Sequence, residues 1–313
     1  MNGDLRHRAN KALLGVDAVV PHTDADGLAA GAIALRARGE TAAAAVLLPR
    51  GETPFGPAPP LPTSVAVLDW GVRPLARPGL VVDHHVPQSK PRDDQVVVSG
   101  YGEKPEVSTA VLLRRLVPEA PAWLAAVGAF GDLGARAFVL PECAGASRSA
   151  VPTLAALVNA PRRVPDGPVR DALALLVEHD DVGSALADPR VARLALAKER
   201  WTAAYRAVIR TAPVVSRDVA LLRFSTPFQV HPLVATAWSR RLAPRLVVAA
   251  NDGYLPGRVN FAVRGAGGDL RRVLREALPE ADGEFAHGHP RATGGSLEPK
   301  LFDELCRRLG VLA

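Results

Sequence analysis

Four short segments of this 313-residue chain carry acidic and imidazole side chains suited to binding metal ions. Each segment follows an apolar stretch of the sequence. The segments are His22-Thr-Asp24-Ala-Asp26-Gly27, Asp69, Asp83-His84-His85 and Asp132. Carboxylates gathered in one place repel one another, and a divalent cation removes that cost. Carboxylate and imidazole ligands without thiolate favour manganese, magnesium or non-haem iron over structural zinc.

The number of carboxylates predicts two ions rather than one. Two ions that share a carboxylate, roughly 3.5–4 Å apart, stabilise both the attacking and the leaving oxygen of a phosphoryl displacement. Taken singly, each segment also has an ordinary structural interpretation, such as a helix-capping aspartate or a solvated strand end. Their combination predicts metal-assisted hydrolysis of a phosphate ester.

The first half of the chain alternates strand and helix patterns, as a parallel α/β sheet does. Strands are expected at residues 16–20, 64–68 and 80–82, and residues 42–48 sit where a further strand should lie. Helices are expected at residues 29–38, 108–116 and 122–130, and residues 51–62, with five prolines, form a surface loop. Because ligands bind beyond the carboxyl ends of strands in such sheets, three of the four segments should converge.

A different pattern begins at Asp188, which caps a helix with Pro189 at its first position. That helix should run to about residue 210. The expected elements beyond it are strands at 219–224, 246–250 and 258–263, turns at 251–253 and 265–268, and helices at 269–278 and 299–309. We predict a catalytic domain over residues 1–187, a helical linker over 188–212 and a smaller α/β substrate-binding domain over 213–313.

Composition indicates a globular protein with an anionic partner. The formal charge is +6, and arginine carries most of the positive charge because the chain has only five lysines. Guanidinium groups match phosphate oxygens, although a GC-rich genome also enriches arginine. Two distant cysteines exclude a disulfide framework and a thiolate zinc site. Without a recognisable signal peptide or a membrane-spanning run, we expect a cytoplasmic protein with no membrane partner.

The four segments resemble the successive motifs of the DHH phosphoesterase superfamily, and Asp83-His84-His85 is the tripeptide that names it. This superfamily includes RecJ-type exonucleases, NrnA-type nanoRNases and manganese pyrophosphatases. Near the carboxyl end, the stretch from Gly288 and His289 to Gly294 and Gly295 resembles the motif of the DHH-associated domain. The strand that ends at Arg264 resembles another part of that domain, so the resemblance covers nearly the whole chain.

The resemblance implies a role for each matching residue. His22, Asp24 and Asp69 would hold one Mn²⁺ ion, and Asp26, Asp69, His84 and Asp132 the other, with Mg²⁺ as an alternative metal. Asp69 would bridge the ions, which activate a hydroxide, and His85 would lie behind the ligands or touch the scissile phosphate. Ser108 and Thr109 would support a ligand or the substrate. Arg264, His287 and His289, with the Gly294–Gly295 backbone, would hold a phosphate or the terminal nucleotide.

Two departures from the family pattern bear on these roles. His22 lies two residues before Asp24, where the nanoRNase and pyrophosphatase branches have four, which puts His22 in doubt as a ligand and favours RecJ-like variants. Ala286, His287 and Gly288 replace three glycines before the histidine of the carboxyl-terminal motif. His287 would add a donor to a phosphate or narrow the pocket.

The expected activity is hydrolysis of short oligonucleotides, or of cyclic or linear dinucleotides, to mononucleotides. A chain of this length resembles the compact branch, in which a homodimer is common and a terminal 3′-phosphate of adenosine bisphosphate is another substrate. The alternative is a RecJ-like single-stranded DNA exonuclease, whose affinity should fall steeply with salt. A pyrophosphatase activity fits less well. A catalytically dead nucleotide-binding module is a further alternative, but such a module need not keep every carboxylate, and this chain keeps them.

Several other features have ordinary structural interpretations. The acidic and histidine run at residues 178–181 predicts solvated helix ends. His231 opens the first helix of the second domain, where a substrate-facing role is the less favoured interpretation. Arg271, Arg272 and Arg275 predict a solvated helix face that would otherwise extend a nucleic-acid track.

Overall fold

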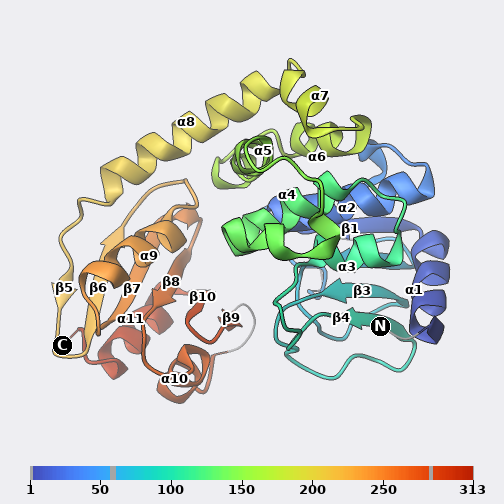
Figure 1. The fold of residues 1–313 in the computed structure, drawn as a ribbon. Coiled ribbons are helices and arrows are strands. Elements are labelled where there is room, and N and C mark those ends of the chain that lie inside the picture. Colours follow the sequence, from blue (N-terminus) through green and yellow to red (C-terminus); the bar gives the residue numbers. More distant parts are fainter. Residues whose placement is uncertain (1–2, 57–60, 282–284, 313) are drawn as a thin grey trace. The chain divides into compact units, whose positions relative to one another are not determined.

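The computed structural model describes residues 3–56, 61–281 and 285–312. The chain divides into two compact units (Figure 1). Unit 1 comprises Met1–Arg162 and Asp166–Lys198, and unit 2 comprises Arg163–Pro165 and Glu199–Ala313. The boundary falls inside one long helix, α8 (Val191–Val208). The predicted α/β fold class, with a parallel sheet followed by a second α/β unit, is confirmed.

Unit 1 is built on a four-stranded parallel sheet in the order β1-β2-β3-β4. Its strands are β1 (Ala18–Pro21), β2 (Val65–Leu68), β3 (Gly79–Asp83) and β4 (Gln95–Ser99). Every residue of β1 and β2 is buried, as expected for a parallel sheet covered on both faces. The three predicted strands are confirmed, whereas β4 was not foreseen.

The strand expected at residues 42–48 is wrong. Ala42–Ala44 forms a 3₁₀ turn, and a single bridge joins Val19 to Ala45. Alanine has low strand propensity, so four consecutive alanines do not sustain a strand at this position. Of the predicted loop at 51–62, residues 57–60 lie outside the described residues, and residues 51–56 and 61–62 contain no helix or strand.

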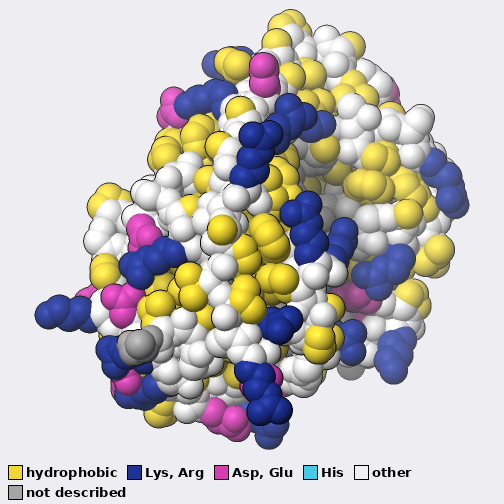
Figure 2. Space-filling model, turned by 90° about the vertical axis from the view of Figure 1, so that its left-hand side faces the viewer, with side chains coloured by type: hydrophobic (Ala, Val, Ile, Leu, Met, Phe, Trp, Pro, Cys, Tyr) yellow, Lys and Arg dark blue, Asp and Glu magenta, His cyan; other side chains and the backbone are white. Residues whose placement is uncertain are grey.

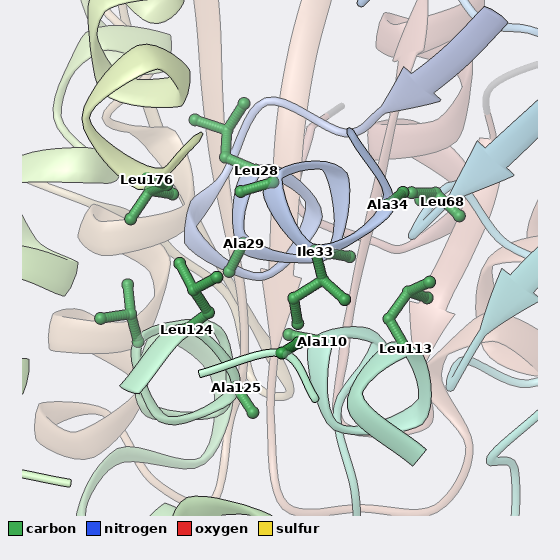
Figure 3. Packing of buried hydrophobic residues seen from close by; sticks show 14 of the residues in the cluster. Leu28, Ala29, Ile33, Ala34, Leu68, Ala110, Leu113, Leu124, Ala125 and Leu176 are labelled. Carbon is green, nitrogen blue, oxygen red and sulfur yellow. The ribbon is translucent and has the colours of Figure 1, made fainter. Parts of the chain in front are cut away.

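Helix α2 is the centre of unit 1. The α-helices that precede α8 in this unit are α1 (Gly3–Gly15), α2 (Ala25–Arg38), α3 (Thr109–Leu116), α4 (Ala122–Leu133), α5 (Ala150–Val158), α6 (Val169–Glu178) and α7 (Val182–Ala187). Every residue of α2 from Ala25 to Leu35 is buried. Figure 3 shows Ala29 and Ile33 of α2 beside Leu124 of α4 and Leu113 of α3. The small alanines let α2, α3 and α4 pack closely, which fixes the acidic residues at their ends.

One stretch, Ala122–Val139, is long and apolar enough to cross a membrane by length and composition. By length and composition alone, this stretch departs from the predicted lack of a membrane-spanning run. Half of it is buried inside the structure, and its α4 part contacts α2, α3 and α5. We interpret it as a core helix.

Unit 2 contains a six-stranded mixed sheet in the order β5-β6-β7-β8-β10-β9. Its strands are β5 (Val214–Val215), β6 (Val219–Phe224), β7 (Leu246–Leu255), β8 (Arg258–Arg264), β9 (Phe285–His289) and β10 (Ala292–Leu297). One face packs on α10 (Leu270–Ala277) and α11 (Pro299–Arg308). The other packs on α9 (His231–Arg241) and the carboxyl-terminal half of α8.

Two sequence expectations for unit 2 differ from the structure. The turn predicted at residues 251–253 is wrong, because β7 continues to Leu255. Asn251 is fully buried, and its side-chain oxygen accepts hydrogen bonds from the backbone N–H groups of Thr226 and Gly253, which lets a polar residue stay inside the strand. The β9–β10 hairpin was not foreseen, because its glycines and histidines lack a strand pattern.

Charged side chains are unevenly distributed over the surface. On the face shown in Figure 2, Lys and Arg side chains occur in several places beside apolar surface, and Asp and Glu form separate, smaller patches. The run at residues 178–181 lies between helix ends as predicted, since α6 ends at Glu178 and Asp181 caps α7.

Candidate metal centre

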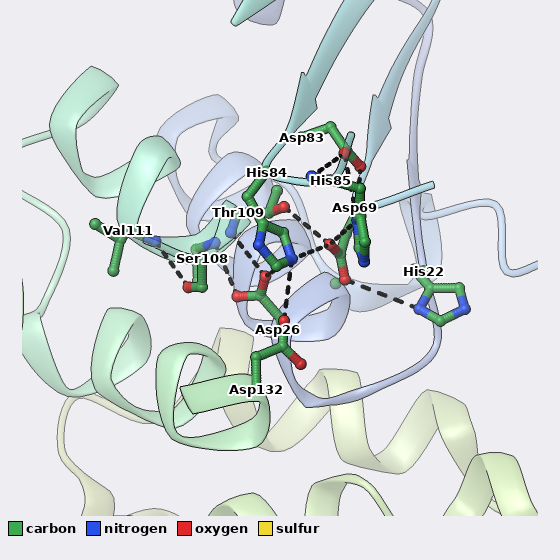
Figure 4. A network of polar contacts seen from close by, with 12 residues as sticks. His22, Asp26, Asp69, Asp83, His84, His85, Ser108, Thr109, Val111 and Asp132 are labelled. Carbon is green, nitrogen blue, oxygen red and sulfur yellow. Dashed lines mark hydrogen bonds and ion pairs between the residues drawn. The ribbon is translucent and has the colours of Figure 1, made fainter. Parts of the chain in front are cut away.

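The carboxyl ends of three parallel strands bring together most of the predicted metal ligands (Figure 4). His22 follows β1, Asp69 follows β2, and Asp83 ends β3 immediately before His84 and His85. Helices supply the remaining members of the set. Asp24 caps α2, Asp26 lies in its first turn, and Asp132 lies in the last turn of α4. Asp132 was expected after its helix, but α4 extends to Leu133 and includes it.

Seven side chains form what we call the acidic–histidine cluster. They are His22, Asp24, Asp26, Asp69, His84, His85 and Asp132. Three groups within this cluster place their ligand atoms within 4.8 Å of one another: His22, Asp24 and Asp69; Asp26, His84 and Asp132; and Asp69, His84 and His85. Asp69 and His84 each belong to two of the groups.

His84 is the centre of one half of the cluster. Its Nε2 lies 3.0 Å from Oδ2 of Asp132, 3.4 Å from Oδ1 of Asp69 and 3.9 Å from Oδ2 of Asp26. Asp26, Asp69 and His84 are buried, whereas Asp132 is partly exposed. Three carboxylates around one imidazole nitrogen form an oxygen-rich site with a single nitrogen donor.

The other half of the cluster is centred on His22. Its Nδ1 lies 2.7 Å from Oδ2 of Asp24 and 3.9 Å from Oδ2 of Asp69. The imidazole packs edge-on against the indole of Trp70, with 4.8 Å between ring centroids. The unusual spacing between His22 and Asp24 therefore does not keep the two side chains apart.

Asp69 is held in an uncommon backbone conformation. Its φ is 68°, in the left-handed region that few residues other than glycine and asparagine adopt. The Thr109 hydroxyl donates a hydrogen bond to its Oδ1 at 2.9 Å. Strained backbones of this kind concentrate at functional sites, where the surrounding structure maintains them.

The amino terminus of α3 holds Asp26 in place. The backbone N–H groups of Thr109 and Ala110 donate to its two carboxylate oxygens at 2.7 and 3.0 Å. Ser108 caps α3 by accepting from the N–H of Val111. Of the predicted Ser108–Thr109 pair, Thr109 therefore contacts two cluster carboxylates, and Ser108 both caps the helix and hydrogen-bonds to Asp26 through its side chain.

The electrostatics of the cluster fit divalent cations. Burial raises the pKa of Asp69 well above its ordinary value, and the charges of Asp26 and Asp24 add to this effect. Burial and the charge of Asp132 raise the pKa of Asp26 to about 6. Burial opposes charging of His84, but its bonds to Asp132 and Asp69 prevail and raise its pKa to about 12. The negative charge of the buried carboxylates exceeds the positive charge of the side chains around them, and bound cations would supply the difference.

Two residues beside the cluster were given no role from the sequence, although Asp83 was named as part of its segment. Asp83 is fully buried, and its carboxylate accepts from the N–H groups of Gly71 and His85, each at 2.6 Å. Its place at the head of the Asp-His-His tripeptide was the available signal. Arg162 donates to Oδ2 of Asp24 at 2.7 Å. No local pattern marks Arg162, because it is 138 residues away from Asp24.

The predicted substrate-binding residues lie in unit 2. Ala292 of β10 pairs with both Arg264 and His289, and Gly294 pairs with Ala262 and His287. Residues in register share a face of the sheet, so Arg264, His287 and His289 point to the same side. Ala262 packs in the cluster that includes α9, which identifies this face as the α9 side.

Arg264 is held without a carboxylate partner among the described residues. Its guanidinium donates to the Thr236 hydroxyl and to the carbonyls of Val263 and Thr293. Burial lowers its pKa to about 10. Gly294 has a packing role of its own, because a Cβ there would lie 2.2 Å from the Phe261 carbonyl oxygen. Gly295 follows at the irregularity in the β9–β10 pairing.

Comparisons with known proteins agree with this geometry. No protein-family model and no curated protein matches the chain. Among solved structures, RecJ from Thermus thermophilus in complex with Mn²⁺ matches with a TM-score of 0.66 and 21% identity, over 98% of this chain and 53% of that one. This chain thus spans about half of that RecJ. A manganese-bound exonuclease RecJ matches with a TM-score of 0.62 and 21% identity, over 98% and 92% of the two chains.

Two further structures share the fold. The DHH domain of PF0399 matches with a TM-score of 0.64 and 15% identity, over 99% of this chain and 90% of that one. The pGpG-specific phosphodiesterase PggH from Vibrio cholerae matches with a TM-score of 0.52 and 14% identity, over 94% and 99%. The chain therefore shares its fold with RecJ, with the DHH domain of PF0399 and with PggH.

Proposed function

We propose that this protein is a metal-dependent phosphodiesterase that hydrolyses short oligonucleotides, or cyclic or linear dinucleotides, to mononucleotides. The convergence of the acidic–histidine cluster at the carboxyl edge of the parallel sheet carries this proposal. The shared fold with manganese-bound RecJ and with a dinucleotide phosphodiesterase supports it. A cytoplasmic location and a homodimer stay predictions from the sequence.

The proposed ligands divide between two Mn²⁺ or Mg²⁺ ions. His22, Asp24 and Asp69 would hold one ion, and Asp26, Asp69, His84 and Asp132 the other. Such ions supply Lewis-acid polarisation of a phosphate ester and a more acidic water molecule. Donation from Thr109 to Asp69, and from the amino terminus of α3 to Asp26, keeps two of these carboxylates oriented before any ligand binds.

His85 is the proposed contact to the scissile phosphate. Its Nδ1 lies 3.3 Å from Oδ1 of Asp83, and Asp83 also accepts from its backbone N–H. Burial opposes protonation of His85, but the bond and charge of Asp83 prevail and raise its pKa. Its side chain is 27% exposed, against 2% for His84. A partly exposed imidazole that a buried carboxylate fixes and favours in its protonated form is suited to bind a phosphate oxygen.

Unit 2 would bind the nucleotide. Arg264, His287 and His289 share one face of the sheet with the small residues Ala292 and Gly294. The guanidinium of Arg264 is charged and lacks a carboxylate partner among the described residues, so a phosphate is its natural counterion.

The second candidate is a RecJ-like single-stranded DNA exonuclease. The coverage of both chains in the match to manganese-bound RecJ favours it. Substrate length separates the candidates, because a long-strand enzyme contacts many phosphates and loses affinity steeply with salt.

A product profile tests the proposal. Purified protein with Mn²⁺ would be incubated with RNA and DNA of two to about twenty nucleotides and with cyclic dinucleotides. We expect the fastest turnover on the shortest substrates, its loss in Asp69→Asn, and its retention in Asp94→Asn, which changes an exposed carboxylate. Mn²⁺-independent hydrolysis, or full activity of Asp69→Asn, would refute the proposed function.

A further inference from the structure

Unit 2 contains a pocket that is lined by none of the predicted substrate-binding residues. It has a volume of about 390 Å³, which is within the usual range for small-ligand sites. Its lining residues are Arg217, Asp218, Pro244, Arg245, Leu246, Gly265, Ala266, Gly267 and Leu270. Arg264, His287 and His289 are not among them, so the pocket is separate from the predicted nucleotide-binding residues.

The walls of the pocket combine arginines with a small-residue loop. Arg217 and Arg245 outnumber the carboxylate of Asp218. The loop at residues 265–267 carries no side chain larger than a methyl group, so its backbone is accessible to a ligand. A Cβ built on Gly267 would meet nothing within 4 Å, which shows that this part of the loop is open.

Backbone contacts fix the two arginines beside each other. Nε of Arg245 donates to the Ser216 carbonyl at 3.2 Å, directly before Arg217. The N–H of Leu246 donates to the Asp218 carbonyl at 2.9 Å, directly after Arg217. These two bonds join the segments just before β6 and β7, so the two loops that carry Arg217 and Arg245 are held to each other.

The positive charge here is not neutralised within the described part of unit 2. Arg217 and Arg245 form no ion pair with its described residues, nor do Arg240 and Arg241, which end α9 just before the pocket. Several other arginines of unit 2 are paired, among them Arg223 with Asp252 and Asp303, and Arg308 with Glu280 and Glu304. Two arginines of the helix face predicted from the sequence are also paired, Arg271 with Asp269 and Arg272 with Glu276.

An aromatic ring adjoins this charge. The guanidinium of Arg241 lies over the indole of Trp238, 5.1 Å from the ring centroid. Unpaired arginines, an accessible glycine-rich backbone and a neighbouring aromatic ring are the components of surfaces that hold the backbone of single-stranded nucleic acid.

We propose that this pocket, with Arg217 and Arg245 as its anion-binding pair, is an auxiliary site for the phosphodiester backbone of a single-stranded nucleic acid. This proposal rests on the proposed function, because it extends the substrate beyond the nucleotides at the reacting bond. Dinucleotides would not need the pocket, whereas longer strands would gain affinity from it.

Fluorescence anisotropy with labelled twenty-nucleotide DNA and RNA tests the proposal. The full chain carrying Asp69→Asn would be used, so that binding is measured without cleavage. We expect the Arg217→Ser/Arg245→Ser double variant to bind roughly tenfold more weakly. Its slope of log affinity against log salt should fall by about 1.4, given roughly 0.7 per phosphate contact on single strands. Arg217→Lys/Arg245→Lys should recover most of the affinity.

The matched control is Arg223→Ser/Arg308→Ser, which removes the same charge from paired arginines. Equal weakening by both double variants would overturn the proposal, as would unchanged binding by the Arg217/Arg245 variant. In the background that keeps Asp69, dinucleotide hydrolysis by this variant should equal that of the unmodified protein, and its loss would also overturn the separate site. Displacement of the strand by millimolar inorganic phosphate alone would show a free-anion site instead.

The outcome is independent of catalysis. If the unmodified protein cleaves no substrate but strand binding still depends on the arginine pair, the proposed function fails and the auxiliary site stands. If dinucleotides are cleaved and strand binding ignores the pair, the reverse holds.

Discussion

Arg162 and Asp24 form an ion pair at 2.7 Å inside the candidate metal centre, and the same Asp24 oxygen lies 2.7 Å from Nδ1 of His22. Burial raises the pKa of Asp24, but the charges of His22 and Arg162 prevail and hold it well below its ordinary value. Arg162 therefore keeps this carboxylate ionised when metal is absent.

Replacing Arg162 should make the protein more dependent on metal. In Arg162→Gln, the half-buried Asp24 loses its cation, and we expect the metal-free protein to lose about 1–3 kcal/mol of unfolding free energy. Mn²⁺ should restore part of this loss, so the rise in Tm on adding Mn²⁺ should exceed that of the unmodified protein. Thermal melts with EDTA and with Mn²⁺ measure both effects, and an equal metal-induced rise would contradict the assigned role of Arg162.

Asp83 should matter although no metal-ligand group contains it. Its two bonds connect the loop after β2 with the backbone of His85. Asp83→Asn keeps the shape but places an amide where one N–H acceptor stood, which should cost about 1–3 kcal/mol and reduce turnover. Urea unfolding and initial rates of Asp83→Asn would be compared with those of Asp94→Asn, which changes an exposed carboxylate just before β4. If the two variants behave alike, Asp83 does not position the site.

The raised pKa of Asp26 predicts how pH acts on the metal-free protein. The ordinary value is 3.8 and the folded value is about 6, so the folded state holds its proton more tightly. The contribution of this group to the free energy of unfolding is fully present below about pH 3.8 and is lost as the pH rises through about 6. Asp26→Asn should lack this loss, which melts in EDTA between pH 4 and 8 would reveal as a difference between the two proteins.

Metal binding should show the opposite trend with pH. The proton on Asp26 must leave before the carboxylate can bind a cation, so Mn²⁺ affinity should rise between pH 5 and pH 7. Calorimetry in buffers with different ionisation enthalpies would measure the protons released. Binding without proton release would argue against Asp26 as a ligand.

Gly294 should be intolerant of a side chain for a structural reason. Its added Cβ would meet the Phe261 carbonyl oxygen at 2.2 Å, so Gly294→Ala should separate β8 from β10 and cost about 1–3 kcal/mol. Gly267→Ala is the control, because its Cβ would meet nothing within 4 Å. A fully stable Gly294→Ala would contradict the packing role of this glycine.

Much of the fold was readable from local patterns. Apolar stretches predicted β2, β3 and β6, and Gly39 ended α2 where expected, in the left-handed conformation. The misassigned elements carried weak local signals. The alanines at residues 42–45 gave no decisive period, and Asn251 and Gly253 resembled a turn until burial and side-chain hydrogen bonds placed them in β7.

The sequence by itself determined which side chains are candidate metal ligands and which strand ends carry them, because residue type and apolar periodicity are local properties. The tertiary structure decided how these side chains meet. It brings Thr109 into hydrogen-bond contact with Asp69, Arg162 with Asp24, and Asp83 with Gly71. It also decides which arginines in unit 2 form ion pairs. Such contacts join residues distant in the chain, and packing, rather than any neighbouring sequence, fixes their geometry.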